Sequence, residues 1–147
     1  MITYKQYVLQ RLADYDAARF ALLTIPERRE TLRLKRETLK SKMNDADPVT
    51  GGGGNRTEDA WITSLAEDAY LEARYHAAER EVQDVEKLLG LLDPQDRRIV
   101  ERSCIRRHAG DIDELCDELG YERAAVYRMR DAALKRLARM MTGEARA

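Results

Sequence analysis

The 147-residue chain has few of the residues on which secreted proteins and enzymes depend. Its two cysteines, Cys104 and Cys116, do not make a disulfide framework, so we expect free thiols in a reducing compartment. Together with His108 they offer three ligands in a spacing unlike common zinc sites, so no metal site is predicted. With two histidines, no nucleophile elbow and no suitable carboxylate pair, the sequence predicts neither an enzyme nor a bound cofactor.

Long hydrophobic runs are also lacking. Charged residues such as Lys5, Arg11 and Asp14 interrupt the N-terminus, and the uncharged stretch from Phe20 to Pro26 is too short to span a bilayer. We therefore expect a cytoplasmic protein without a membrane partner. The formal net charge is only −1, so any surface suited to nucleic acid must be a local basic one.

What is present is helical periodicity along most of the chain. Apolar residues recur at spacings of three and four, which predicts an all-α protein. We expect a long antiparallel, coiled-coil-like helical hairpin over residues 1–92, with a glycine-rich loop at 45–56. A C-terminal three-helix domain of helix-turn-helix type should follow over 93–141, with a flexible tail at 142–147.

The first arm of the hairpin should begin after Thr3, whose hydroxyl can cap a helix running to about residue 23. Pro26 then either kinks this helix or lies in the first turn of a new one. Four consecutive glycines disfavour a regular helix, so the second arm should begin after them, with Thr57 as its cap. The apolar stripe of the second arm is expected to include Trp61, Ile62, Leu65, Ala69, Ala73, His76, Val82, Val85, Leu88, Leu89 and Leu92.

Charge supports the pairing of the two arms. Residues 26–44 hold seven basic and three acidic residues, whereas residues 58–92 hold three basic and nine acidic ones. Helices of opposite charge joined by a flexible loop should lie antiparallel. DNA contact is an alternative interpretation of the basic run from Arg28 to Lys42. Pairing with the acidic second arm explains this run as well or better.

The C-terminal part contains two short helices joined at Gly120-Tyr121. Asp93 and Pro94 should start the domain as cap and first helical residue. The helix from Ile112 to Leu119 has four acidic residues and no basic one, whereas six basic residues and two acidic ones lie between Tyr121 and Thr142. A basic second helix after an acidic first one suits a recognition helix that lies against phosphates.

Residues 93–139 resemble sigma factor region 4. The similarity lies in Leu92-Asp93-Pro94-Gln95-Asp96-Arg97-Arg98, in Leu119-Gly120-Tyr121, in Val126-Tyr127-Arg128-Met129 and in Ala133-Leu134-Lys135-Arg136-Leu137. With the preceding hairpin and its glycine-rich loop, the whole chain is similar to the small phage and prophage late-transcription activators of the ArpU/RinA type. Such turns usually have Ser or Thr as the helix cap, where this chain has Glu122.

The resemblance implies which side of the recognition helix, about residues 122–139, would face DNA. It places Arg123, Ala124, Tyr127 and Arg128 on that side, and Val126, Met129 and Leu134 on the core side. Arginine can read guanine edges, but phosphate contact or a solvated position is the alternative for Arg123 and Arg128. A partly buried ring is the alternative for Tyr127. The candidate DNA-binding residues are Arg123, Ala124, Tyr127, Arg128, Arg130, Lys135 and Arg136.

The function expected from these features is sequence-specific transcription regulation, by the resemblance as a late-gene activator of a phage or prophage. Double-stranded DNA would be the main partner, with RNA polymerase and a second copy bound through the hairpin as further candidates. Two alternatives stay open: a packaging protein of the small-terminase kind, and a polymerase-binding module that acts through protein contacts.

Overall fold

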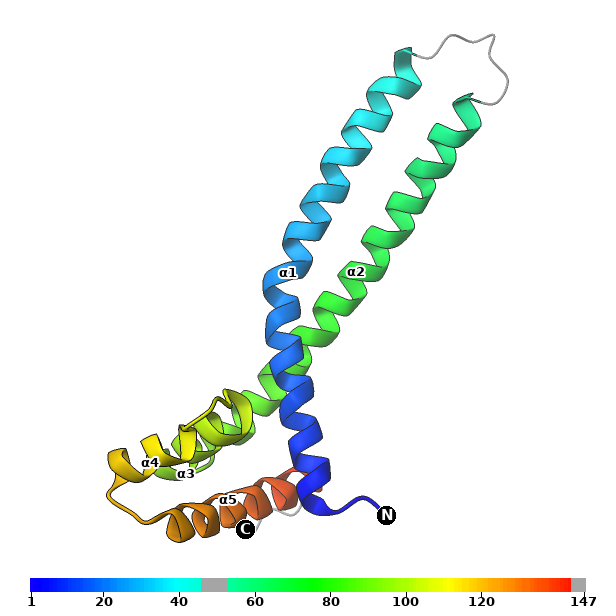
Figure 1. Ribbon diagram of the computed structural model, residues 1–147. Helices are drawn as coiled ribbons and strands as arrows, with labels where there is room; N and C mark the ends of the chain where they lie inside the picture. The colour runs from blue at the N-terminus through cyan, green and yellow to red at the C-terminus, as the bar shows by residue number, and fades with distance from the viewer. Residues whose placement is uncertain (46–52, 144–147) are drawn as a thin grey trace. The chain divides into compact units, whose positions relative to one another are not determined.

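The structure, a computed structural model, describes residues 1–45 and 53–143, and all secondary-structure elements in these ranges are helices, which confirms the all-α prediction. No helix in the described ranges has the length and apolar character needed to cross a membrane. The helices are α1 (Tyr4–Asp45), α2 (Gly53–Gly90), α3 (Pro94–Val100), the π-helical turn η1 (Glu101–Ile105), α4 (Asp111–Leu119) and α5 (Arg123–Met141) (Figure 1).

The start of α1 is fixed by reciprocal hydrogen bonds between Thr3 and Gln6. The Gln6 N–H donates to Thr3 Oγ1 at 3.2 Å, and the Thr3 N–H donates to Gln6 Oε1 at 2.9 Å. This capping box satisfies two amides that a helix start leaves without partners, and it confirms the predicted cap. α1 then continues through Pro26 to Asp45, so Pro26 does not begin a new helix.

The start of α2 corrects one prediction. The helix begins at Gly53, four residues before the expected cap at Thr57, and so includes part of the glycine-rich sequence. The first turn of a helix has few internal hydrogen bonds to lose, so glycine is tolerated there more easily than in the interior. The rest of the expected loop, residues 46–52, lies outside the described residues.

The chain forms two compact units. Unit 1 comprises residues 1–18 and 81–147, and unit 2 comprises residues 19–80. This division differs from the expected boundary at residue 92, because the first turns of α1 and the last turns of α2 share a core with the C-terminal helices. Two hydrophobic residues illustrate this: Leu12 from α1 and Leu89 from α2 belong to the same buried cluster as Leu134 of α5.

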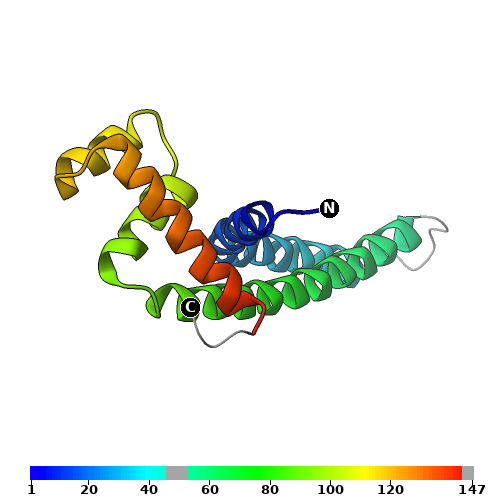
Figure 2. The same ribbon diagram turned by 90° about the horizontal axis from the view of Figure 1, so that it is seen from below.

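Unit 1 has two apolar clusters. The larger joins α1, α2, α3 and α5 through Val8, Leu12, Tyr15, Val85, Leu89, Leu92, Val100, Ala133, Leu134, Leu137 and Ala138. The smaller consists of Ile112, Leu115 and Val126, with Cys116 and Leu119 packed against it, and it holds α4 to the first half of α5. Figure 2 shows α5 passing beside α3 and the start of α1. The two clusters therefore anchor α5 along its length.

Unit 2 contains the later part of α1 and the earlier part of α2, which lie side by side in opposite directions (Figures 1 and 2). Arg28 pairs with Glu67 at 2.8 Å, and Arg29 pairs with Asp68 at 2.8 Å. Farther along α1, Arg36 donates to Ser64 Oγ at 3.3 Å. From Arg29 to Arg36 the partner's number falls from 68 to 64, as an antiparallel pair requires. Three of the seven basic residues of this run thus contact α2, whereas Arg33 pairs with Glu30 and Glu37 of α1 itself.

The residues of α2 that face α1 in unit 2 correct the predicted apolar stripe. Buried or half-buried positions follow alternating steps of three and four, the repeat of a coiled-coil seam: Trp61, Ser64, Asp68, Leu71, Tyr75 and Ala78. By contrast, five residues expected in the seam are exposed: Ile62, Leu65, Ala69, Ala73 and His76. The prediction was wrong here because the seam contains polar residues, which a search for apolar periodicity passes over.

Candidate nucleic-acid interface

The candidate interface is the segment that joins α4 to α5 and the first half of α5. Gly120 ends α4 in the left-handed region, with φ of 76°, and its N–H donates to the Cys116 carbonyl at 2.8 Å. A residue with a side chain is strained in this conformation, so glycine suits the turn. Glu122 is extended immediately before α5 begins at Arg123. The chain thus reverses over three residues and brings α5 against α4.

One side of α5 is buried in the core. Val126, Ala133, Leu134 and Leu137 are fully buried, as their spacing predicts, and Met129 is half-buried. The opposite side of its first turns exposes Arg123, Ala124, Tyr127 and Arg128. The structure therefore brings together on one exposed surface the four residues that the family resemblance implied.

Arg123 is held by an acid from α4. Its Nη1 lies 2.5 Å from Asp113 Oδ1, and both side chains are mostly exposed. The hydrogen bond to Asp113 raises the pKa of Arg123, so its positive charge is secure. The pair orients the guanidinium beside the turn, and Asp113 is a residue that the sequence analysis did not identify.

Arg128 and Lys135 are exposed, and neither forms an ion pair within residues 1–45 and 53–143. Arg130 is different. Its guanidinium carbon lies 5.8 Å from the centre of the Tyr127 ring, and its Nε is buried without a hydrogen-bond partner among the described residues. Arg130 therefore supports the position of Tyr127 and is less available to a ligand than Arg128.

Arg136 contacts α3. Its Nη1 lies 2.9 Å from Asp96 Oδ2 and 3.5 Å from Asp93 Oδ2. Asp93 precedes α3 as predicted, but its side chain makes no capping hydrogen bond and contributes to this pair. Arg136 thus links α5 to the start of α3, and it lies farther along the helix than the four exposed residues of the first turns.

Several acidic groups around this surface form ion pairs within unit 1. Asp131, the one acid of α5, lies 3.1 Å from Lys5 Nζ. On α4, Glu118 pairs with Arg98 at 3.0 Å, and Glu114 pairs with both Arg102 and His108. Among the described residues, Asp117 of α4 and Glu122 before α5 form no ion pair, so part of the acid near the six basic residues of α5 stays unpaired.

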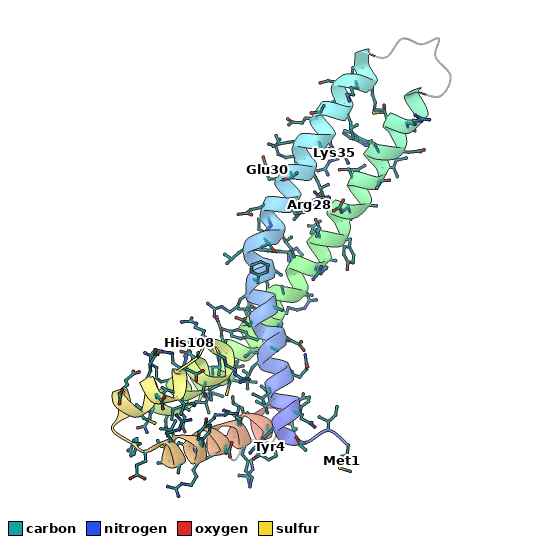
Figure 3. The ribbon with its side chains drawn as sticks, in the orientation of Figure 1. Met1, Tyr4, Arg28, Glu30, Lys35 and His108 are labelled. Carbon is teal, nitrogen blue, oxygen red and sulfur yellow. The ribbon has the colours of Figure 1, made fainter. Side chains whose placement is uncertain are left out.

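His108 lies in the turn between η1 and α4 (Figure 3). Its ring contacts the Arg106 carbonyl at 3.3 Å and Glu114 Oε2 at 3.1 Å. The hydrogen bond with the Arg106 carbonyl, followed by the one with Glu114, raises the pKa of His108. The turn that precedes α4 therefore contains an ionisable group that binds its proton more tightly than free histidine.

The N-terminus of α5 has no side-chain cap. Glu122 occupies the cap position and makes no capping hydrogen bond, in keeping with its being a poorer cap than Ser or Thr. The first amides of a helix have no partner within it and attract anions. These amides lie next to the exposed Arg123 and Ala124, so the start of α5 combines backbone donors with positive charge.

The thiols and acids do not form a metal site in the described part of the chain, where no group of three or more potential ligands is suitably arranged. Burial raises the pKa of the Cys104 thiol, which packs against the larger apolar cluster.

No protein-family model, curated protein or solved structure matches this chain in comparison. The similarity to sigma factor region 4 and to late-transcription activators therefore stays a prediction.

Proposed function

We propose that this protein is a sequence-specific DNA-binding transcription regulator that places the first half of α5 in the major groove. The observation that carries the proposal is the exposed surface formed by Arg123, Ala124, Tyr127 and Arg128, held by two apolar clusters and reached through a tight turn. An α-helix with long polar side chains on its exposed side fits the major groove of B-DNA.

Each part of the surface has a role in this proposal. Arg128 is exposed and has no ion pair in the described residues. Two nitrogens of its guanidinium can donate to the O6 and N7 acceptors of guanine. Tyr127, beside Arg130, offers an aromatic ring to a thymine methyl or a hydroxyl to a phosphate. When DNA binds, Arg123 leaves Asp113 and contacts a phosphate or a base edge. The free energy gained from this contact is reduced by the loss of the ion pair with Asp113.

Phosphate binding would be divided between the start of α5 and its later turns. The uncapped amides at the start of α5 can donate hydrogen bonds to one phosphate, and Lys135 and Arg136 lie farther along the same helix. Contacts of this kind give affinity and orientation without reading sequence. The small formal net charge of the chain is compatible with this role because the positive charge is concentrated on α5.

The biological role proposed is activation of late operons in a phage or prophage. It rests on the resemblance of residues 93–139 to sigma factor region 4 and of the whole chain to activators of the ArpU/RinA type. RNA polymerase is then the second partner, and the bacterial cytoplasm is the compartment in which the protein acts.

The proposal is tested by selecting bound sites from random duplex DNA at moderate salt. One enriched motif is expected, and the affinity for it should fall as salt rises, because bound cations are released from phosphates. The Arg123→Ala, Arg128→Ala double variant should no longer enrich that motif. Recovery of no motif by the wild-type protein, with intact binding to RNA polymerase, would instead identify a module that acts through protein contacts.

A further inference from the structure

The one acidic residue of α5 lies on the exposed side of this helix. Asp131 follows Tyr127 by four residues and Arg128 by three, and it precedes Lys135 by four. Residues three and four apart are neighbours on the surface of a helix, so Asp131 lies between residues proposed to enter the major groove and a residue proposed to contact phosphate. An unpaired carboxylate at this position would repel the phosphates of DNA.

A residue from the start of α1 neutralises this acid. The Nζ atom of Lys5 lies 3.1 Å from Asp131 Oδ2, and each of the two side chains is 44% exposed. Both residues belong to unit 1, and the start of α1, labelled at Tyr4 in Figure 3, lies beside α5. The pair is therefore on the surface of unit 1, on the side from which DNA would approach α5.

The position of Lys5 is fixed by the structure around it. Lys5 lies between Thr3 and Gln6, whose reciprocal hydrogen bonds form the capping box of α1. Val8, three residues after Lys5, is fully buried in the larger apolar cluster, which also contains Leu134 of α5. Capping and apolar packing thus hold the first turn of α1 against α5, and the ion pair is not needed to place Lys5 there.

The pair matters more for charge than for stability. An ion pair as exposed as this one contributes little to the free energy of unfolding, because water and salt screen it. Without Lys5, the Asp131 carboxylate would be within reach of Arg128 and Lys135, its neighbours on the same helix. Either of these cations would then be drawn to the acid, and it would be less available to DNA.

We propose that Lys5 is a positioning residue of the DNA interface, because it pairs with Asp131 and so leaves Arg128 and Lys135 available to DNA. This inference rests on the proposed function and extends the interface from α5 to the first turn of α1. It also explains how the exposed side of a DNA-binding helix can contain an acidic residue.

Fluorescence anisotropy of the full chain with the selected DNA site tests this role. Lys5→Ala should weaken binding by about tenfold, since it leaves the acid unpaired beside the phosphates. Adding Asp131→Asn should restore the affinity to within about threefold of the wild type, because the double variant has no acid to neutralise and keeps the wild-type net charge.

Lys87→Ala is the matched control for charge. Lys87 is an exposed residue of α2 in unit 1, and it forms no ion pair with α5 among the described residues. Its replacement removes the same charge as Lys5→Ala and should change the affinity by less than about threefold. Urea unfolding of each variant verifies that the fold is retained, and Lys5→Ala should unfold at nearly the wild-type concentration of urea.

Three results would overturn the inference. These are wild-type affinity in Lys5→Ala, equal weakening by Lys87→Ala, and failure of Asp131→Asn to restore binding. Weakening by Asp131→Asn alone would also overturn it, because the carboxylate would then contact DNA itself. If the wild-type protein binds no duplex DNA, the proposed function fails and this inference fails with it. If the wild type binds and Lys5→Ala binds equally well, only this inference fails.

Discussion

Units 1 and 2 differ in the side chains that pack between their helices. The larger cluster of unit 1 is entirely apolar apart from the Tyr15 hydroxyl, which donates to Glu86. The seam of unit 2 instead contains Arg29, Arg36 and Asp68 among its apolar residues, with Asp68 lying 2.8 Å from Arg29 and 3.7 Å from Arg36. Apolar burial supplies more stability than a partly buried ion pair, whereas a polar group in a seam favours one register. Unit 1 is thus built to hold α5 firmly, and unit 2 to fix how two long helices align.

The largest expected effect is the loss of a core side chain in unit 1. Leu134→Ala should lower the free energy of unfolding by about 3 to 5 kcal/mol, because Leu134 is fully buried and its removal leaves a cavity. Urea unfolding followed by circular dichroism measures this loss. Leu34→Ala is the control, since Leu34 is 50% exposed in unit 2, and it should change stability by less than about 0.5 kcal/mol. Similar losses for both variants would remove the distinction between the units.

A smaller loss is expected from the seam of unit 2. Asp68→Ala leaves Arg29 and Arg36 without their shared acid and should cost about 2 kcal/mol. Replacing Arg29 and Asp68 together by leucine should recover most of this loss, because the closer ion pair is then removed as a whole and Arg36 keeps its hydrogen bond to Ser64. The same urea experiment measures both. A double variant less stable than Asp68→Ala would show that the polar seam stabilises unit 2 as well as aligning it.

Acid should weaken unit 2 through the same residue. The hydrogen bond from Arg29, with the charges of Arg29 and Arg36, holds the pKa of Asp68 below its ordinary value of 3.8. A group with a lowered folded pKa stabilises the protein above its unfolded pKa, and this contribution is lost as pH falls through the folded value. Asp68→Asn should therefore reduce the fall in stability between neutral pH and pH values below 3.8. An unchanged acid profile would exclude Asp68 as a source of acid sensitivity.

The smallest effect is expected at His108 in unit 1. Its folded pKa is raised above 6.5, so its contribution is present below pH 6.5 and is lost as pH rises through the folded pKa. Melting temperatures at pH 6 and pH 8 should differ slightly more for the wild type than for His108→Gln. The His108 side chain is on the surface, so a large difference would contradict a surface pair with Glu114 as its cause.

The sequence predicted the elements that depend on local pattern. The Thr3 cap, the start of α3 at Pro94 and the buried face of α5 follow from capping chemistry and from spacings of three and four. The resemblance to sigma factor region 4 implied the outward side of Arg123, Tyr127 and Arg128, and their exposure agrees with the periodicity of the buried stripe opposite.

What could not be predicted depends on contacts between distant residues. Asp68 lies in a seam only because Arg29 and Arg36 compensate its charge across the helix pair. Arg136 was grouped with the DNA-binding residues, yet its pairing with Asp96 depends on how α3 packs against α5. The division of the chain near residues 18 and 81 likewise depends on which apolar residues meet, which a single helical pattern does not determine.

The measurement that tests the central claim most directly is fluorescence anisotropy with the selected DNA site. Arg123→Ala with Arg128→Ala should weaken binding by about a hundredfold, since each arginine contact with DNA contributes about 1 to 3 kcal/mol. Arg28→Ala with Lys35→Ala removes the same charge from α1 in unit 2, where both residues are labelled in Figure 3, and should change affinity by less than about threefold. Equal weakening by the two double variants would contradict an interface on α5 and would indicate binding through general charge.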